Sequence, residues 1–144
     1  MKWLHDINLM TTVCIAMFWG IVFLQSALDK VFDFKGNLEW LTGHFEKTPL
    51  NGTVKPALIT LTIFEFAAGA LSLIGLVIFL INGSTFWIQQ GVILVMVSLV
   101  MLIFGQRVAK DYEGAKTIAI YFGIALVCVL ILNQPLAEVV QGTE

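Results

Sequence analysis

The sequence predicts an all-α membrane protein: a four-transmembrane-helix antiparallel bundle with a short interfacial helix in the first loop. Of the 144 residues, 58% are hydrophobic and 12% are charged, whereas about 25% of the residues in a soluble domain are charged. The apolar residues form long blocks separated by polar turn residues. We therefore expect residues 1–144 to form a single transmembrane domain.

Four apolar blocks are long enough to cross the ~30 Å hydrocarbon core of a bilayer as helices. They cover about residues 7–28, 57–81, 86–106 and 117–133, and the last block is the shortest. The first block is too long for the apolar core of a signal peptide, and no small-x-small cleavage pattern follows it. We therefore expect the first block to be retained as a membrane span.

The first two spans carry small residues at helical spacing. Ala16 and Gly20 are four positions apart in the first span, and Ala68, Ser72 and Gly75 form a similar stripe in the second. Small residues at this spacing allow another helix to approach closely within a membrane. These faces are therefore expected to pack against other helices.

The connection between the first two spans is too polar to cross a membrane and too aromatic for a solvated linker. Asn37 is a suitable N-cap for a short helix, in which Leu38, Leu41 and Phe45 would share one apolar face. We therefore expect an interfacial helix over about residues 37–47, lying on the end of the bundle.

The second span carries a single ionisable residue, Glu65, nine positions after Pro56. Pro56 would open the helix at its first position, where a missing N–H has no cost. Glu65 would then lie ~13 Å along the helix, close to the middle of the bilayer. A lone charge at that depth is costly, so we expect Glu65 to face the interior and to pair with Lys30 or Arg107, directly or through water.

Polar residues gather at one end of the predicted bundle, where the first and third spans end and the second begins. They form a candidate intramembrane cluster that consists of Glu65, Lys30, Arg107, Gln25, Asp29 and Gln106. Two interpretations remain open at this point. The cluster is either an ion pair that fixes the helix register, or a polar pocket for a headgroup, a quinone ring or a proton.

Other chemistries lack their sequence signatures. Zinc, P-loop and catalytic-triad motifs do not occur, so no catalytic residue and no metal site is assigned. Cys14 and Cys128 lie alone in apolar blocks, which favours buried thiols, although their similar predicted depth leaves a disulfide open. The net charge of −2 and the lack of a basic run argue against a nucleic-acid partner.

Lysine and arginine are distributed unevenly along the chain. Seven of them lie in loops 29–55 and 107–116, whereas Lys2 is the only one in the termini and the remaining turn. The positive-inside rule therefore predicts that these two loops are cytoplasmic and that both termini are outside.

Several short runs resemble the DoxX family of small four-helix bacterial membrane proteins. The runs are Gly20-Ile-Val-Phe23, Ser26-Ala-Leu-Asp-Lys30, Gly36 and Glu65-Phe-Ala-Ala-Gly69-Ala-Leu71-Ser-Leu-Ile-Gly75. The similarity covers the first two spans best and extends little beyond Gly105-Gln106 in the second half. Within it, Lys30 and Glu65 match the family pattern.

The resemblance implies a protein of the bacterial inner (plasma) membrane that is linked to redox systems. The namesake of the family is a subunit of a thiosulfate:quinone oxidoreductase, and related bundles act as maturation or assembly factors. This chain has no pair of haem ligands within its spans and no dithiol motif. That departure argues against independent redox catalysis.

We therefore expect a non-catalytic accessory or assembly subunit of a larger respiratory or redox complex. Its expected partners are the lipid bilayer and other membrane protein subunits, and no cofactor is assigned, although a quinone or a lipid could occupy the polar pocket. One alternative is a quinone-linked oxidoreductase subunit in which Glu65 handles protons. The other is a small carrier with Glu65 as its binding site.

Overall fold

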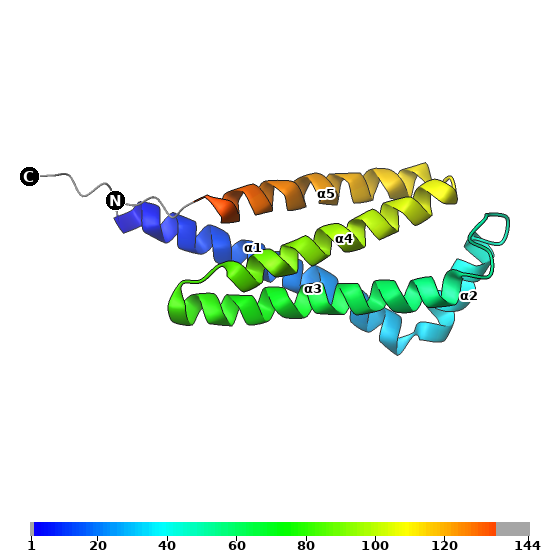
Figure 1. The fold of residues 1–144 in the computed structure, drawn as a ribbon, viewed down its shortest axis with the longest axis horizontal. Helices are drawn as coiled ribbons and strands as arrows, with labels where there is room; N and C mark the ends of the chain where they lie inside the picture. Colours follow the sequence, from blue (N-terminus) through cyan, green and yellow to red (C-terminus); the bar gives the residue numbers. More distant parts are fainter. Residues whose placement is uncertain (1, 135–144) are drawn as a thin grey trace, which may run out of the picture.

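The computed structural model describes the backbone of residues 2–134 and the side chains of residues 7–134. Five helices follow one another along this part of the chain (Figure 1): α1 (Lys2–Phe32), α2 (Phe34–His44), α3 (Val54–Asn82), α4 (Phe86–Val108) and α5 (Tyr112–Asn133). All except α2 are long and apolar enough to cross a membrane. The predicted all-α fold with four membrane-spanning helices is therefore confirmed.

Two of the four spanning helices extend well beyond the apolar blocks that predicted them. α1 continues to Phe32, and α5 begins at Tyr112 rather than near residue 117. The early start of α5 has a local cause, because the Asp111 side chain accepts a hydrogen bond from the Gly114 backbone N–H at 3.0 Å and caps the helix. Polar residues at a membrane interface can thus belong to a span without entering the hydrocarbon.

The short helix α2 exists, but the predicted N-cap is wrong. Asp33 caps the helix by accepting a hydrogen bond from the Gly36 backbone N–H at 3.2 Å. Asn37 lies one turn inside and donates its side-chain amide to the Asp33 carbonyl at 2.8 Å. The helix therefore begins at Phe34 and ends at His44, before the predicted end near residue 47.

The start of the second span also differs from the prediction. α3 begins at Val54, after the N-cap Thr53, so Pro56 occupies the third helical position instead of the first. The first four N–H groups of a helix have no partner inside that helix. A proline at the third position therefore still costs no hydrogen bond.

α3 is the central helix, because it packs along α1 on one side and along α4 on the other, whereas α5 packs mainly along α4 (Figure 1). The small residues predicted to lie at helix contacts do so within this chain, and Gly69, which the prediction did not include, does so as well. A Cβ added to Gly69 would lie 2.6 Å from the Leu24 backbone nitrogen, and one added to Gly75 would lie 2.6 Å from that of Ile88. These backbones could not approach so closely around larger residues.

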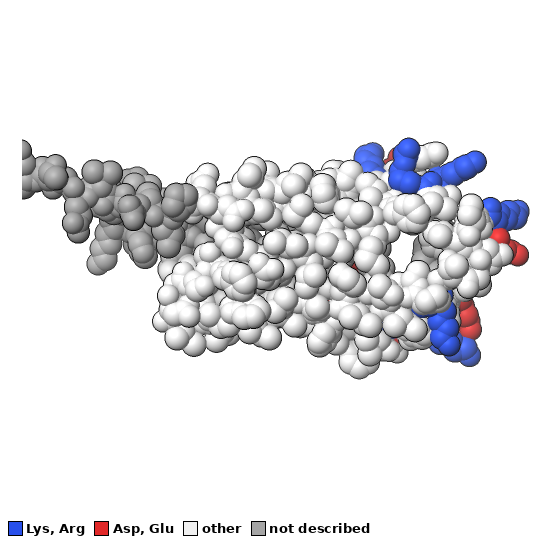
Figure 2. Space-filling model, in the orientation of Figure 1, with Lys and Arg blue, Asp and Glu red and all other residues white. Residues whose placement is uncertain are grey.

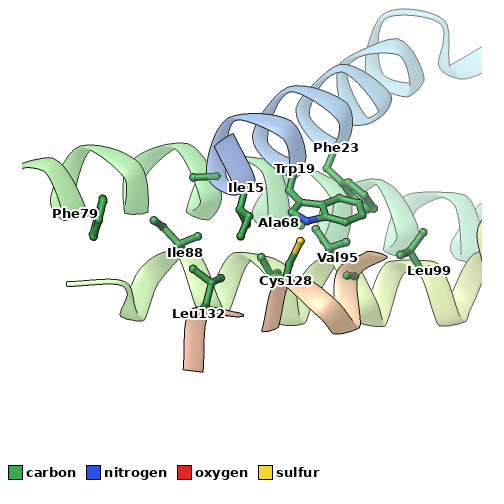
Figure 3. Packing of buried hydrophobic residues seen from close by; sticks show 13 residues of the cluster. Ile15, Trp19, Phe23, Ala68, Phe79, Ile88, Val95, Leu99, Cys128 and Leu132 are labelled. Atoms are coloured by element: carbon green, nitrogen blue, oxygen red, sulfur yellow. The ribbon is translucent and has the colours of Figure 1, made fainter. Parts of the chain in front are cut away.

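The core lies between α1, α3, α4 and α5, around Trp19 (Figure 3). This indole is fully buried, with edge-to-face contacts to Phe23 on its own helix and to Tyr121 on α5. Tyr121 therefore links α5 to α1 across the bundle. The Trp19 indole N–H has no hydrogen-bond partner within the described chain.

Most of the charged residues of the described chain lie at one end of the molecule, where α1 ends, α3 begins and α4 leads into α5 (Figure 2). Among residues 7–134, every Lys, Arg, Asp and Glu except Glu65 belongs to this end. The α3–α4 turn at the opposite end carries none, whereas Lys2 and Asp6 belong to the first turns of α1 at that end. This polarity is the one on which the predicted orientation rests, whereas residues 1 and 135–144 of the termini lie outside the described residues.

Candidate functional site

The buried carboxylate of Glu65 is the centre of the site. It lies on the inward face of α3 and is 1% exposed. The Lys30 ammonium, from the last turns of α1, lies 2.9 Å from Glu65 Oε2. Of the two basic partners considered from the sequence, Lys30 is thus the residue in contact with Glu65.

Ser26 joins the two charged groups. Lys30 Nζ donates to the Ser26 hydroxyl at 2.8 Å and to the Ser26 carbonyl at 3.3 Å, and the Ser26 hydroxyl donates to Glu65 Oε1 at 3.3 Å. The contact between Glu65 Oε2 and Lys30 Nζ is an ion pair that lacks the geometry of a hydrogen bond. The three residues form one unit that joins α1 to α3.

The hydroxyl of Ser26 was missing from the predicted cluster, although the sequence contains a signal for it. Residues four apart lie on the same face of a helix, so Ser26 shares the face of Lys30. Gln25 and Asp29 are also four apart, but they lie about 100° around the helix from that face. Both are exposed in the structure.

Arg107 is likewise separate from Glu65. Its guanidinium lies 4.8 Å from the centre of the Tyr112 ring, and its side chain is exposed. Such a cation–π contact places the charge over the aromatic face at the membrane surface. The expected convergence of all six polar residues on one pocket is therefore not what the structure contains.

Gln106 occupies a second polar position, apart from the ion pair. It lines a cavity next to α2, and its amide oxygen Oε1 is enclosed without a hydrogen-bond partner in the described chain. The amide nitrogen lies beside Gly114, as does the Asp111 carboxylate. Glu65 does not line this cavity.

The depth of Glu65 differs from the sequence estimate. Because α3 begins earlier than predicted, Glu65 lies ~17 Å from the start of the helix and ~26 Å from its end. It belongs to the half of the span nearer the charged end, within reach of a lysine that extends inward from the interface. Lys30 keeps 16% of its side chain exposed, so this long side chain bridges interface and interior.

The arrangement neutralises a charge inside the membrane. Removing one partner of such a pair would leave an uncompensated charge, whereas the intact pair adds little stability compared with apolar residues. Among the described residues, no three or more His, Cys, Asp or Glu side chains lie close enough to hold a metal ion. The geometry of this ion pair supports a role in fixing the register of α1 on α3. The cavity beside α2 gives no access to Glu65, because Glu65 is not part of its lining.

The two cysteines line the same groove and do not form a disulfide. Cys14 on α1 and Cys128 on α5 are both free thiols, the first exposed and the second buried. Both line an apolar groove of about 800 Å³ between these helices, in the half away from the charged end. The groove separates α1 from α5 beyond the contact between Trp19 and Tyr121.

Comparison of the chain with protein-family models, curated proteins and solved structures found no match. The resemblance to the DoxX family therefore depends on the short sequence runs named above alone and stays a prediction.

Proposed function

We propose that this integral membrane protein is a non-catalytic accessory or assembly subunit of a larger membrane complex, of respiratory or redox type. The observation that carries the proposal is the outer face of α5. This helix has α4 as its main neighbour, and 22% of its most apolar segment is buried, against 33% in each other span. A spanning helix with one free side offers a surface to another membrane protein.

Gly123 is a small residue on the outer face of α5 that no other part of the described chain covers. A glycine within a helix costs about 1 kcal/mol relative to alanine, and close helix packing is the usual compensation in membranes. The other glycines within the spans meet a neighbouring side chain or backbone when a Cβ is added, whereas Gly123 meets nothing within 4 Å. Ala119, one turn earlier, is also exposed, so the two small residues form an uncovered contact face.

The other small-residue faces do not support a partner. Ala16, Ala68 and Ser72 are fully buried within the chain, and Gly69 and Gly75 contact α1 and α4. The proposal therefore concerns α5 specifically, and the ion pair of Lys30 and Glu65 serves to hold α1 against α3.

The two alternative functions, a quinone-linked enzyme subunit and a small carrier, both assign a chemical role to Glu65. A proton-handling subunit of a quinone-linked enzyme, or a small carrier, would need Glu65 to be reached by water or substrate. Glu65 is almost fully buried, is paired with Lys30, and lines neither the cavity beside α2 nor the groove between α1 and α5. We therefore rank both below the accessory role.

The proposal places the protein in a bacterial inner membrane, with the charged end cytoplasmic. The support is the location of seven of the eight basic residues at that end together with the positive-inside rule. The bacterial source follows from the DoxX resemblance alone.

Purification from native membranes in a mild detergent, without cross-linker, tests the accessory role. We expect stoichiometric partner subunits with the unchanged chain and their loss with Gly123→Leu. Val77→Leu adds bulk at an exposed position on α3 and should leave the complex intact. A monomer, or an oligomer of this chain alone, would contradict the proposal, and a bound quinone or a visible absorbance band would favour the enzyme alternative.

A further inference from the structure

A cavity of about 350 Å³ lies beside α2 at the charged end of the molecule. Figure 2 shows a hollow at this end, where α2 and the start of α3 stand apart from the end of α4. α2, the loop that follows it, and the facing turns of α3 and α4 supply the walls. The cavity has the size of a site for a small organic molecule.

The cavity extends from the membrane interface into the apolar part of the spans. Leu61 of α3 and Met101 of α4 belong to its lining, and each lies ~10 Å inside its helix from the charged end. Leu41 and Phe45 of α2 belong to the lining as well. Water in a cavity needs several polar partners for each molecule, so these walls favour a hydrocarbon chain.

The cavity lies beside lipid. Trp40 and Phe104 belong to its lining, and both are strongly exposed on the surface of the chain. Phe104 lies on a spanning helix, so a chain of a bilayer lipid can enter the cavity without crossing water. The occupant is therefore expected to come from the membrane.

Most polar groups of the lining are engaged within the chain. The Thr53 hydroxyl donates to the Leu50 carbonyl at 2.8 Å, and the Asp111 carboxylate accepts from the Gly114 N–H at 3.0 Å. The charge of Asp111 also lies at the N-terminus of α5, where the helix dipole stabilises it. The Gln106 amide oxygen is enclosed by the chain, so a molecule in the cavity does not reach it. The walls therefore offer little to a polar head inside the cavity.

His44 is the remaining polar residue of the lining. Its ring stacks on the exposed Trp40, with the ring centres 4.8 Å apart. An imidazole donates an N–H when it is neutral and carries a positive charge when it is protonated. His44 therefore suits an anionic head better than a cationic one.

Four basic residues next to the cavity form no ion pair with a carboxylate of the described chain. Lys30, Lys35 and Lys116 do form such pairs. The other basic residues among residues 7–134 lie in the loop before α3, the first turn of α3, the last turn of α4 and the turn after it. They are Lys47, Lys55, Arg107 and Lys110. The same segments contain two carboxylates, Glu46 and Asp111, so a net positive charge remains, and Figure 2 shows basic side chains beside the hollow.

Lys110 has a backbone conformation that favours glycine. Its φ of 58° lies in the left-handed region, where a glycine commonly follows the last turn of a helix. Residues that are held in such strained conformations cluster at functional sites. The lysine at this position is therefore better explained by a role of its side chain than by the turn.

Arg107 lies three residues before Lys110 and is exposed. Its guanidinium lies 4.8 Å from the centre of the Tyr112 ring. Stacking uses the face of the guanidinium and leaves N–H groups on its edge, which match the oxygens of a phosphate. Arg107 is therefore suited to bind a phosphate at the membrane surface.

We propose that this cavity is a binding site for an anionic phospholipid. One acyl chain occupies the apolar interior, and the phosphate lies at the mouth, where Arg107 and Lys110 bind it. Basic positions next to the ends of spans favour anionic lipids. A free phosphate ion lacks the chain and a neutral lipid lacks the charge, so neither uses both parts of the site.

Quenching of Trp40 fluorescence in vesicles measures this binding, because Trp40 lines the cavity. The vesicles consist of phosphatidylcholine with a minor fraction of phosphatidylglycerol, and bromine is placed on the acyl chains of one lipid at a time. The contribution of Trp40 is the difference from Trp40→Phe. We expect brominated phosphatidylglycerol to quench roughly tenfold or more efficiently per molecule, since each Lys or Arg near an anionic lipid contributes about fivefold.

Arg107→Gln and Lys110→Gly test the binding of the phosphate. Each should lower the preference for phosphatidylglycerol roughly fivefold. Glycine suits a φ of 58°, so Lys110→Gly should not lower the melting temperature, and its effect on binding is then separate from stability. Lys35→Gln removes an exposed charge of α2 at the same end and should leave the preference unchanged.

Ala57→Phe tests the binding of the acyl chain. Ala57 is an exposed residue of α3 that lines the cavity, so a larger side chain there should occupy the cavity and abolish the preferential quenching. Ile59→Phe adds bulk at an exposed position of α3 that is not part of the lining. This control should quench as the unchanged chain does.

Three results would overturn the proposal. Equal quenching by the two lipids would show an apolar cavity without a headgroup site. A preference that Lys35→Gln lowers as much as Lys110→Gly would show only a general attraction of the basic surface for anionic lipids. A preference that Ala57→Phe leaves unchanged would place the lipid outside the cavity. None of these results depends on whether α5 binds a partner.

Discussion

The Lys30 ammonium and the Glu65 carboxylate lie 2.9 Å apart between α1 and α3, yet Lys30 directs its hydrogen bonds to Ser26. The attraction between the charges is therefore combined with a hydroxyl that donates to the second carboxylate oxygen. Because all three groups lie on two facing helices, any change in the register of α1 on α3 would break several contacts together.

Substitution of Lys30 by Met should strongly destabilise the protein. It would leave the Glu65 charge buried without a partner, at a cost of about 3–5 kcal/mol. The double variant Lys30→Met with Glu65→Gln removes both charges and should recover most of that loss. The free energy of unfolding in mixed detergent micelles measures the effect, and additive effects of the two substitutions would contradict the coupling.

Substitution of Ser26 by Ala should cost about 1–2 kcal/mol, because the carboxylate loses a donor and the ammonium loses an acceptor. Ser98 provides the matched control, since this buried hydroxyl donates to the Leu94 carbonyl on its own helix. Ser98→Ala should change the unfolding free energy little. Equal effects of the two substitutions would argue against a bridging role for Ser26.

Two glycines should respond to alanine in opposite directions. Gly69→Ala would place a Cβ 2.6 Å from the Leu24 backbone nitrogen, so α1 and α3 must separate and the melting temperature should fall. Gly123→Ala adds a methyl group in open space and should stabilise the isolated protein by up to ~1 kcal/mol. Thermal unfolding of the purified variants distinguishes these outcomes, and a matching change in both would contradict the packing described for α3.

The capping of α5 predicts an effect at Gly114. A Cβ there would lie 2.5 Å from Asp111 Oδ2 and 2.6 Å from Gln106 Nε2, so Gly114→Ala should displace the capping carboxylate. We expect a loss of about 1 kcal/mol, similar to that of Asp111→Ala. The double variant should be no less stable than the worse single variant when unfolding is followed by circular dichroism.

The orientation can be tested by labelling of cysteines introduced at the two ends. In a background without Cys14 and Cys128, Ser84→Cys in the α3–α4 turn should react with an impermeant maleimide in intact cells. Lys35→Cys in α2 should react only after the membrane is opened. The opposite pattern would reverse the proposed orientation.

The spans and the charged pair were predictable because they depend on composition. A block of about twenty apolar residues has few alternatives to a spanning helix, and a single carboxylate within such a block requires a partner. Lys30 and Arg107 were equivalent candidates in sequence. Their difference arises from the turn after α4, which brings Tyr112 under the guanidinium.

The polar cluster was predicted too broadly because neighbouring residues were treated as one group. Gln25 and Ser26 are adjacent in sequence, yet the helix directs the first outward and the second toward Glu65. The cavity beside α2 was not predictable from spacing. It depends on where the loop after α2 places that helix relative to α3 and α4.

The attachment of α5 has a mechanical consequence. Along most of its length α5 packs through one face against α4. Near the C-terminal end of α5, Gln89 Nε2 of α4 donates a hydrogen bond to the Leu132 carbonyl at 2.8 Å. The remaining flank can exchange lipid for protein while α1 and α3 stay locked around their buried charges. Binding of a partner at α5 can therefore occur without disturbing the packing of α1 on α3.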